Sequence, residues 1–193
     1  MVYSVNRLLR ESGGAATVAV SIQDPLQHLV ACHERIEERL QTLERVSGRL
    51  RSDSEEKRQE AREALDKALE FLETMGTLHT QDEEQSVFPR LLANGRDEGP
   101  MLMELTSMLE GQHREKEAVF KKLLDHVAAF PPAPAPPSEQ QASLFEGFVA
   151  QLAGLYRPHI MIENQRLIPL STEYLHEPDL EQIREEMRNR RGL

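Results

Sequence analysis

Four histidines of this sequence are each followed, four residues later, by a glutamate, and the four pairs form two copies of one pattern. The pairs are His33/Glu37, His79/Glu83, His113/Glu117 and His159/Glu163. The interval from the first pair to the third equals the interval from the second to the fourth (113 − 33 = 159 − 79). On a helix, positions i and i+4 lie one above the other on the same face. Each pair therefore directs an imidazole and a carboxylate to one side, a donor set that suits a transition metal such as iron.

Helical start and stop signals divide most of the chain into long segments. Asp24 followed by Pro25 is an N-cap with proline in the first turn, and Ser52 with Glu55, like Ser138 with Gln141, has the spacing of a capping box. Asn94-Gly95 is a stop signal, and the proline-rich stretch 131–137 indicates an extended connector. The sequence therefore predicts helices over about 24–50, 52–94, 100–127 and 138–167.

Apolar residues recur along each predicted helix with a period near 3.6, and the histidines fall within these stripes. The third stripe is Leu102, Leu105, Leu109, His113, Glu117, Phe120, Leu124 and Val127. The fourth is Leu144, Phe148, Leu152, Leu155, His159, Glu163 and Leu167. Pro89 and Pro169 are expected to terminate helices.

Four long helices joined by short connections predict an all-α fold, an up-down-up-down antiparallel four-helix bundle with a short extra C-terminal helix. The predicted divisions are an N-terminal arm over 1–23, the bundle over 24–170 and an extension over 171–193. In such a bundle the starts of the first and third helices meet the ends of the second and fourth. All four paired histidines then lie roughly 14–21 Å from the same end, at the usual rise per residue. They can therefore meet in one layer.

Composition and charge exclude several classes of protein. The formal charge is −10 and the sequence pI is about 5.2, which argues against nucleic-acid and anionic-membrane partners. A single cysteine, Cys32, cannot form an internal disulfide. The first twenty residues contain Arg7 and Arg10 but no long apolar run, so no signal peptide is expected there. We therefore expect a cytoplasmic protein, without a specific indication of a protein partner or homo-oligomer.

The second and fourth pairs match beyond the His and Glu. The segment 78–89 aligns with 158–169, with His, Glu and Pro at offsets zero, four and ten from His79 and His159. Together with the Tyr156-Arg157-Pro158-His159-Ile160 segment, this pattern resembles the hemerythrin-like, HHE cation-binding family. The resemblance covers residues 24 to about 170.

The resemblance implies a non-haem di-iron centre inside the bundle. By that resemblance, Glu83 and Glu163 would bridge two irons, His33 and His79 would hold one, and His113, Glu117 and His159 would hold the other. A small ligand would then bind at the iron with fewer ligands, the one near His33 and His79. Glu37 is not a ligand in that pattern and is expected on a solvated face. Tyr156, one turn before His159, is either a hydrogen-bonding partner of the centre or a packing residue.

Two classes of function stay open. In the first, the centre binds or senses oxygen, peroxide or nitric oxide, or handles iron. In the second, it is an enzyme that decomposes peroxide or reduces a nitrogen oxide at an open coordination position. A metal-free structural bundle ranks last, because it would leave Glu83, Glu117 and Glu163 buried without compensation.

Overall fold

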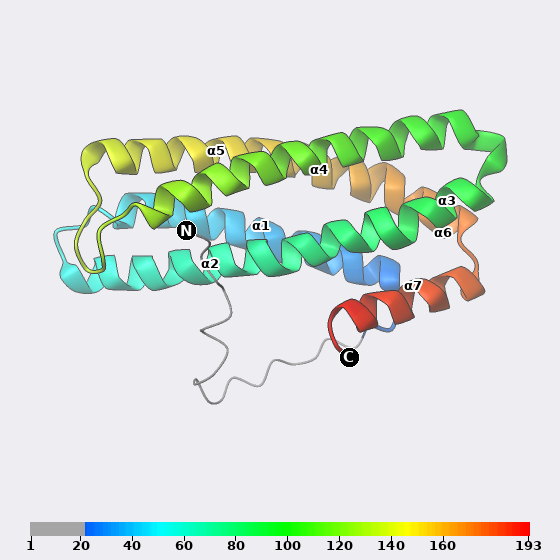
Figure 1. The fold of residues 1–193 in the computed structure, drawn as a ribbon, viewed down its shortest axis with the longest axis horizontal. Coiled ribbons are helices and arrows are strands. Elements are labelled where there is room, and N and C mark those ends of the chain that lie inside the picture. The colour runs from blue at the N-terminus through cyan, green and yellow to red at the C-terminus, as the bar shows by residue number, and fades with distance from the viewer. Residues whose placement is uncertain (1–21) are drawn as a thin grey trace.

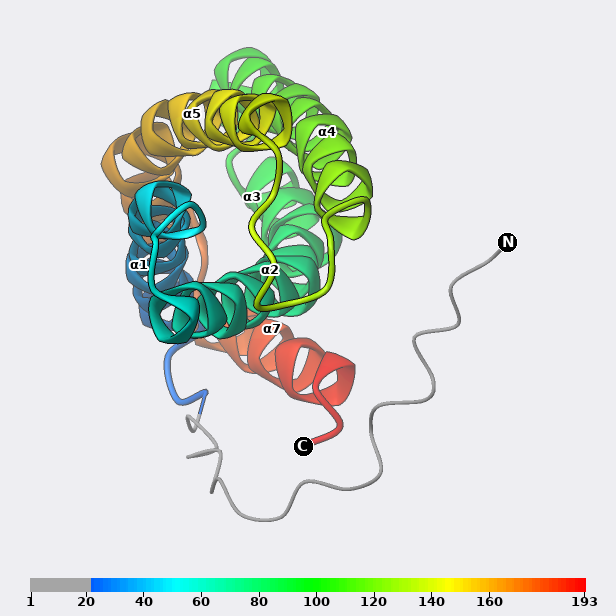
Figure 2. The ribbon, with the colours of Figure 1, turned by 90° about the vertical axis from the view of Figure 1, so that its left-hand side faces the viewer.

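The computed structural model describes residues 22–193, and every regular element within them is helical. Four long helices lie side by side around a common axis (Figures 1 and 2), an arrangement consistent with a four-helix bundle. They are α1 (Pro25–Arg49), α2 (Glu55–Asp82), α4 (Gly99–Ala128) and α5 (Glu139–Ile162). The prediction of an all-α protein is confirmed. The arm predicted over 1–23 lies almost wholly outside the described residues.

The ends of the long helices follow from local sequence. The Asp24 carboxylate accepts hydrogen bonds from the backbone N–H groups of Leu26 and Gln27 at 2.9 and 3.1 Å, so α1 begins at the predicted N-cap. The capping box of Ser138 and Gln141 is confirmed at the start of α5. At α2 the prediction was two residues early, because Ser54 is the N-cap and accepts from the N–H of Lys57 at 3.3 Å.

A π-helical turn follows each of α2 and α5, at equivalent places in the two repeats. These turns, η2 (Glu83–Val87) and η4 (Glu163–Leu167), lead directly into the short helices α3 (Phe88–Asn94) and α6 (Ile168–Tyr174). The prediction that Pro89 and Pro169 terminate helices is wrong, since both lie in the first turn of a new helix. Proline has no N–H and would leave a carbonyl without its partner inside a continuous α-helix. In the first turn of a helix that N–H is not needed, and the π turn just before each proline lets a new helix begin there.

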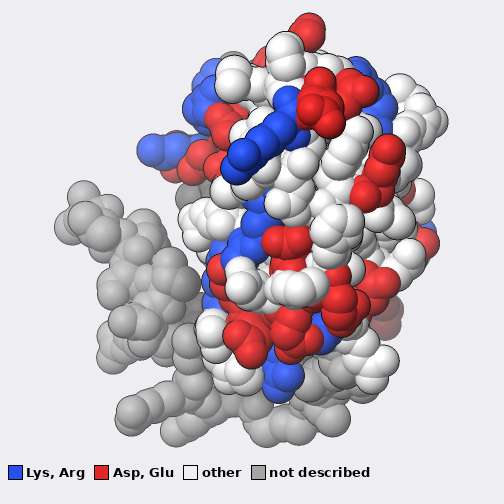
Figure 3. All heavy atoms as spheres, turned by 90° about the vertical axis from the view of Figure 1, so that its right-hand side faces the viewer, with Lys and Arg blue, Asp and Glu red and all other residues white. Residues whose placement is uncertain are grey.

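Beyond these turns, the short 3₁₀ helix η3 (Arg96–Glu98) leads into α4, and α7 (Glu177–Arg190) follows α6. Helix α7 lies outside the ring of long helices, beside α1 and α2 (Figures 1 and 2), and buries Ile183 and Met187. At the end of the molecule shown in Figure 3, acidic and basic side chains lie next to one another. Within residues 22–193, no helix is both long and apolar enough to cross a membrane.

The interior consists of two apolar clusters along the helices with a polar layer between them. One cluster includes Leu40, Leu65, Leu123 and Phe145, and the other includes Leu29, Phe88, Leu105 and Leu167. Along the chain, each paired histidine is followed on one side and preceded on the other by buried residues of the two clusters. The predicted histidine layer is therefore a buried polar layer enclosed by apolar packing on both sides.

The predicted stripes of α4 and α5 are partly one residue out of register. On α4 the buried positions after His113 are Lys116, Val119, Leu123 and Val127, whereas Glu117 is exposed. On α5, Phe145 and Val149 are buried, and the predicted core residue Leu144 is 49% exposed. Steps of three and of four residues both keep a side chain near one face of a helix. Periodicity alone therefore could not tell which of two adjacent residues is buried.

Candidate metal centre

The polar layer brings together four histidines and two glutamates from different elements. Helices α1, α2, α4 and α5 each supply one histidine, and each π turn begins with a glutamate; the six residues are His33, His79, Glu83, His113, His159 and Glu163. All six are at most 5% exposed. π turns are uncommon and frequent at functional sites, and here both begin at a residue of the cluster.

The six side chains form two overlapping groups of four donors. One group is His33, His79, Glu83 and Glu163, and the other is Glu83, His113, His159 and Glu163. Within each group the donor atoms lie within 4.8 Å of one another. The two glutamates belong to both groups. Each group could therefore hold a cation, and the two carboxylates are common to both groups.

Several separations between donor atoms are close to those expected around an ion. His33 Nε2 lies 3.1 Å from both His79 Nε2 and Glu163 Oε2. In the second group, His113 Nε2 lies 3.3 Å from Glu83 Oε2, and His159 Nε2 lies 2.6 Å from Glu163 Oε1. Ligands about 2.1 Å from one ion stand roughly 3.0–3.4 Å apart at octahedral to tetrahedral angles. Most of these contacts need only small adjustments to admit a cation.

Three of the histidines have partners that orient the ring. The Nδ1 atoms of His33, His113 and His159 lie 2.8, 2.7 and 2.7 Å from side-chain oxygens of Asn164, Glu84 and Gln112, respectively. A hydrogen bond from Nδ1–H fixes the tautomer that leaves Nε2 free to bind a metal.

These partners were missed by the sequence reasoning, although the repeat contains a signal for two of them. In the repeat, His33 corresponds to His113 and Asn164 corresponds to Glu84, so the pair His33/Asn164 in one copy is equivalent to the pair His113/Glu84 in the other. By the same offset, Gln112 corresponds to Cys32, which has no amide oxygen to accept from His79. Within residues 22–193, His79 Nδ1 accordingly has no hydrogen-bond partner.

The electrostatics of the layer favour a bound cation. All four carboxylate oxygens of Glu83 and Glu163 are buried without an aligned hydrogen bond from any part of the described chain. Burial, and next the proximity of Glu163, raise the pKa of Glu83 to about 7. Burial also lowers the pKa of His79 well below its usual value. Leaving such groups uncompensated is costly, and a cation between the donors would supply the missing partner, so these residues fit a metal.

Two of the paired glutamates lie outside the cluster. Glu117, a predicted ligand, is exposed on α4 and belongs to neither donor group. Without it, each group has two histidines and the same two glutamates, so the number of ligands does not distinguish the two positions. Glu37 forms an ion pair with Arg157 at 3.1 Å, on the solvated side of α1.

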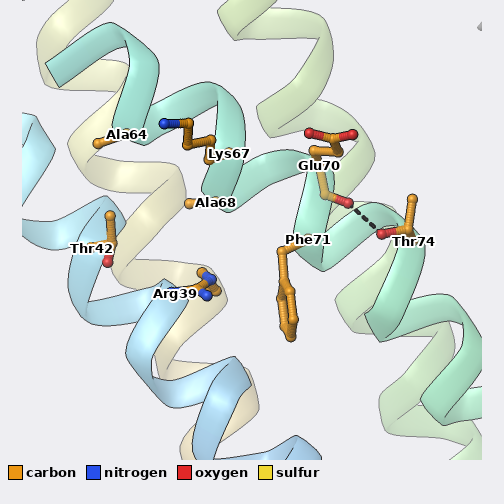
Figure 4. A pocket seen from close by; sticks show the side chains of 8 residues that line it. All are labelled: Arg39, Thr42, Ala64, Lys67, Ala68, Glu70, Phe71 and Thr74. Atoms are coloured by element: carbon orange, nitrogen blue, oxygen red, sulfur yellow. Dashed lines mark hydrogen bonds between the residues drawn. The ribbon is translucent and has the colours of Figure 1, made fainter. Parts of the chain in front are cut away.

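Other grooves on the molecule lie away from the centre. The groove in Figure 4, between α1 and α2, is lined by residues that include Arg39, Lys67 and Phe71 and contains none of the six donors. In it, the Arg39 guanidinium lies 5.0 Å from the centroid of the Phe71 ring, and the Thr74 hydroxyl donates to the Glu70 carbonyl at 2.7 Å. The groove is thus a surface feature of the helix pair.

Comparison with known proteins identifies the family. The model of the hemerythrin HHE cation-binding domain matches residues 24–171, which include the whole candidate centre. The chain therefore belongs to the hemerythrin HHE family, as the sequence resemblance indicated. A search of curated proteins found no match. Family and geometry together support metal binding by the buried His/Glu cluster.

Proposed function

We propose that this protein binds two iron ions in a non-haem di-iron centre, which binds or senses a small ligand such as oxygen, peroxide or nitric oxide. The observation that carries the proposal is the pair of buried donor groups that share Glu83 and Glu163. We also infer that α1, α2, α4 and α5 form the expected up-down-up-down antiparallel bundle. Short connections join α1 to α2 and α4 to α5, and α2 continues through η2 and α3 to the turn before α4.

The donor set favours two ions over one and iron over softer metals. A single structural zinc takes four ligands, whereas six buried donors converge here. Nitrogen and carboxylate donors without thiolate suit iron, although affinity alone does not select the metal. Two histidines and two shared carboxylates would leave coordination positions for solvent or a small ligand on a six-coordinate ion. We therefore propose His33, His79, Glu83, His113, His159 and Glu163 as the ligands.

Metal analysis of purified, iron-loaded protein tests the ligand set. We expect about two irons per chain in the wild type, because two groups of donors share the bridging carboxylates. His79→Ala and Glu83→Gln should lose at least one of the two. Glu117→Ala is the matched control, since the same kind of side chain is removed from the exposed face of α4.

A wild-type iron content near one, or full iron retention in Glu83→Gln, would contradict the proposed centre. Loss of iron in Glu117→Ala would indicate that Glu117 is a metal ligand. Addition of oxygen, nitric oxide and peroxide to the loaded protein, followed by optical spectroscopy, separates binding from turnover. A stable spectral change supports a binding or sensing protein, whereas sustained release of oxygen from peroxide would assign an enzyme.

A further inference from the structure

A pocket of about 440 Å³ lies between α2 and α4 and reaches the candidate centre from one side. His113, a proposed ligand, and Glu84, its hydrogen-bonding partner, are among the lining residues. Lys116 and Tyr156 also line it, and Tyr156 comes from α5. The pocket therefore connects solvent with the His113 side of the centre.

Lys116 is an unusual residue for this position. It is only 4% exposed, and no carboxylate oxygen in the described part of the chain lies close enough to form an ion pair with it. Its Nζ instead lies 4.6 Å from the centroid of the Tyr156 ring. Lysines are almost never so buried unless they are paired, because desolvation of an ammonium group is costly. An unpaired buried cation facing a pocket is a place where an anion would be stabilised.

The internal repeat shows that this feature belongs to one half of the molecule. With the offset that relates His33 to His113, Lys116 corresponds to Ile36 and Tyr156 corresponds to Gly76. The half around His33 thus has a buried aliphatic side chain and a glycine where the half around His113 has an ammonium and a phenol. The two halves, equal in their histidine and glutamate donors, differ in charge and hydrogen-bonding capacity at this point.

Tyr156 adds a second donor to the same pocket. A Cβ built on Gly76 would lie 3.6 Å from the Tyr156 hydroxyl oxygen, so the phenol lies directly over this glycine. Burial raises the pKa of Tyr156, which keeps the hydroxyl protonated and able to donate. Burial lowers the pKa of Lys116 to about 8, and the nearby Glu163, Glu83 and Glu84 oppose this change.

We propose that Lys116 and the Tyr156 hydroxyl form a subsite for a small monovalent anion at the inner end of this pocket. Small anions such as azide or nitrite then reach the metal centre through this pocket, which His113 lines. The subsite rests on the proposed function, since it serves a metal-bound centre. Neutral ligands such as nitric oxide gain no comparable attraction from the ammonium group.

Azide titration of the iron-loaded protein tests the subsite, with iron content measured on every sample. Lys116→Gln should raise the azide Kd about tenfold, because a charge-assisted contact is lost. Lys116→Arg, which keeps the charge, should recover much of the affinity. Lys121→Gln is the matched control, because it removes an exposed lysine of the same helix. Nitric oxide affinity should stay unchanged in all three variants.

The outcomes separate this inference from the proposed function. If the wild type does not bind two irons, the proposed function fails at the metal analysis. If iron content is normal but azide binds Lys116→Gln as tightly as the wild type, the subsite is wrong and the centre stands. Equal losses of azide and nitric oxide affinity in Lys116→Gln would also overturn it, since they would indicate a structural role for the lysine.

Discussion

His28 is a buried histidine that lies on α1 outside the metal layer. It is 6% exposed, and neither ring nitrogen has a hydrogen-bond partner within residues 22–193. Burial, followed by the charges of Arg191 and Arg35, lowers its pKa from 6.5 to about 4. The folded protein therefore holds this imidazole in its neutral form at pH values where the unfolded chain would protonate it.

This difference predicts an acid-dependent loss of stability that a single substitution should remove. Between pH 6.5 and about 4 the unfolded state binds the extra proton, so stability falls as the pH decreases through this window. From pH 7 to pH 5 the loss due to His28 should be about 2 kcal/mol. Urea unfolding of wild type and His28→Leu at both pH values measures it. The same pH dependence in both proteins would contradict the assignment.

At the scale of the elements, α7 is attached to the π turn that carries Glu83. Asp82, fully buried and adjacent to Glu83, accepts from Arg190 at 2.8 Å and from Arg191 at 2.6 Å. Arg190 also donates to the Ser86 hydroxyl at 2.6 Å. The end of α7 therefore contacts the chain on both sides of a proposed bridging ligand, and it should help to hold that carboxylate in place.

Removal of these contacts should weaken both the fold and the metal centre. The double variant Arg190→Ala/Arg191→Ala leaves the Asp82 carboxylate buried without a cation, and this should cost about 3–5 kcal/mol of unfolding free energy. Iron should also leave this variant faster than the wild type when a chelator is added. Arg188→Ala, on the exposed side of α7, is the control.

Asp82→Asn in the double-variant background completes the comparison. It should recover part of the lost stability, because the uncompensated charge is removed. Chemical denaturation of the four proteins measures these differences. If the double variant unfolds and releases iron like the wild type, α7 does not position Glu83.

In the molecule as a whole, the metal layer lies between two well-packed apolar clusters and is expected to be less stable than either when no metal is bound. Without metal, two carboxylates and four imidazoles share this layer, and burial opposes their ionisation. A ligand that binds only the folded state stabilises it. We therefore expect metal to protect the segments that contribute the layer more than the rest of the helices.

Hydrogen exchange of metal-free and iron-loaded protein measures this protection. Residues 79–84 and 156–163 should exchange about tenfold faster, or more, in the metal-free form. Residues 40–46 of α1, within the larger apolar cluster, are the internal reference and should change much less. Equal exchange of both regions in the two forms would show that the layer is stable without metal.

Local signals in the sequence predicted the fold class and most of the candidate centre. Period 3.6 and the capping residues predicted the long helices, because both signals are local to each helix. The repeated His-x-x-x-Glu spacing predicted the histidine layer, and the family resemblance singled out Glu83 and Glu163 among the four paired glutamates. These features follow from positions along one helix or from the repeat, and they need no knowledge of distant contacts.

The side of α4 that enters the interior depends on contacts between the helices. Lys116 and Glu117 are consecutive residues, three and four positions after His113, and contact with α2 and α5 buries the former and exposes the latter. The π turns and the contacts of α7 with Asp82 were equally outside the reach of periodicity. A rotation of a fraction of a helical turn is fixed by the packing of all neighbouring helices together, and a single-helix pattern tolerates either choice.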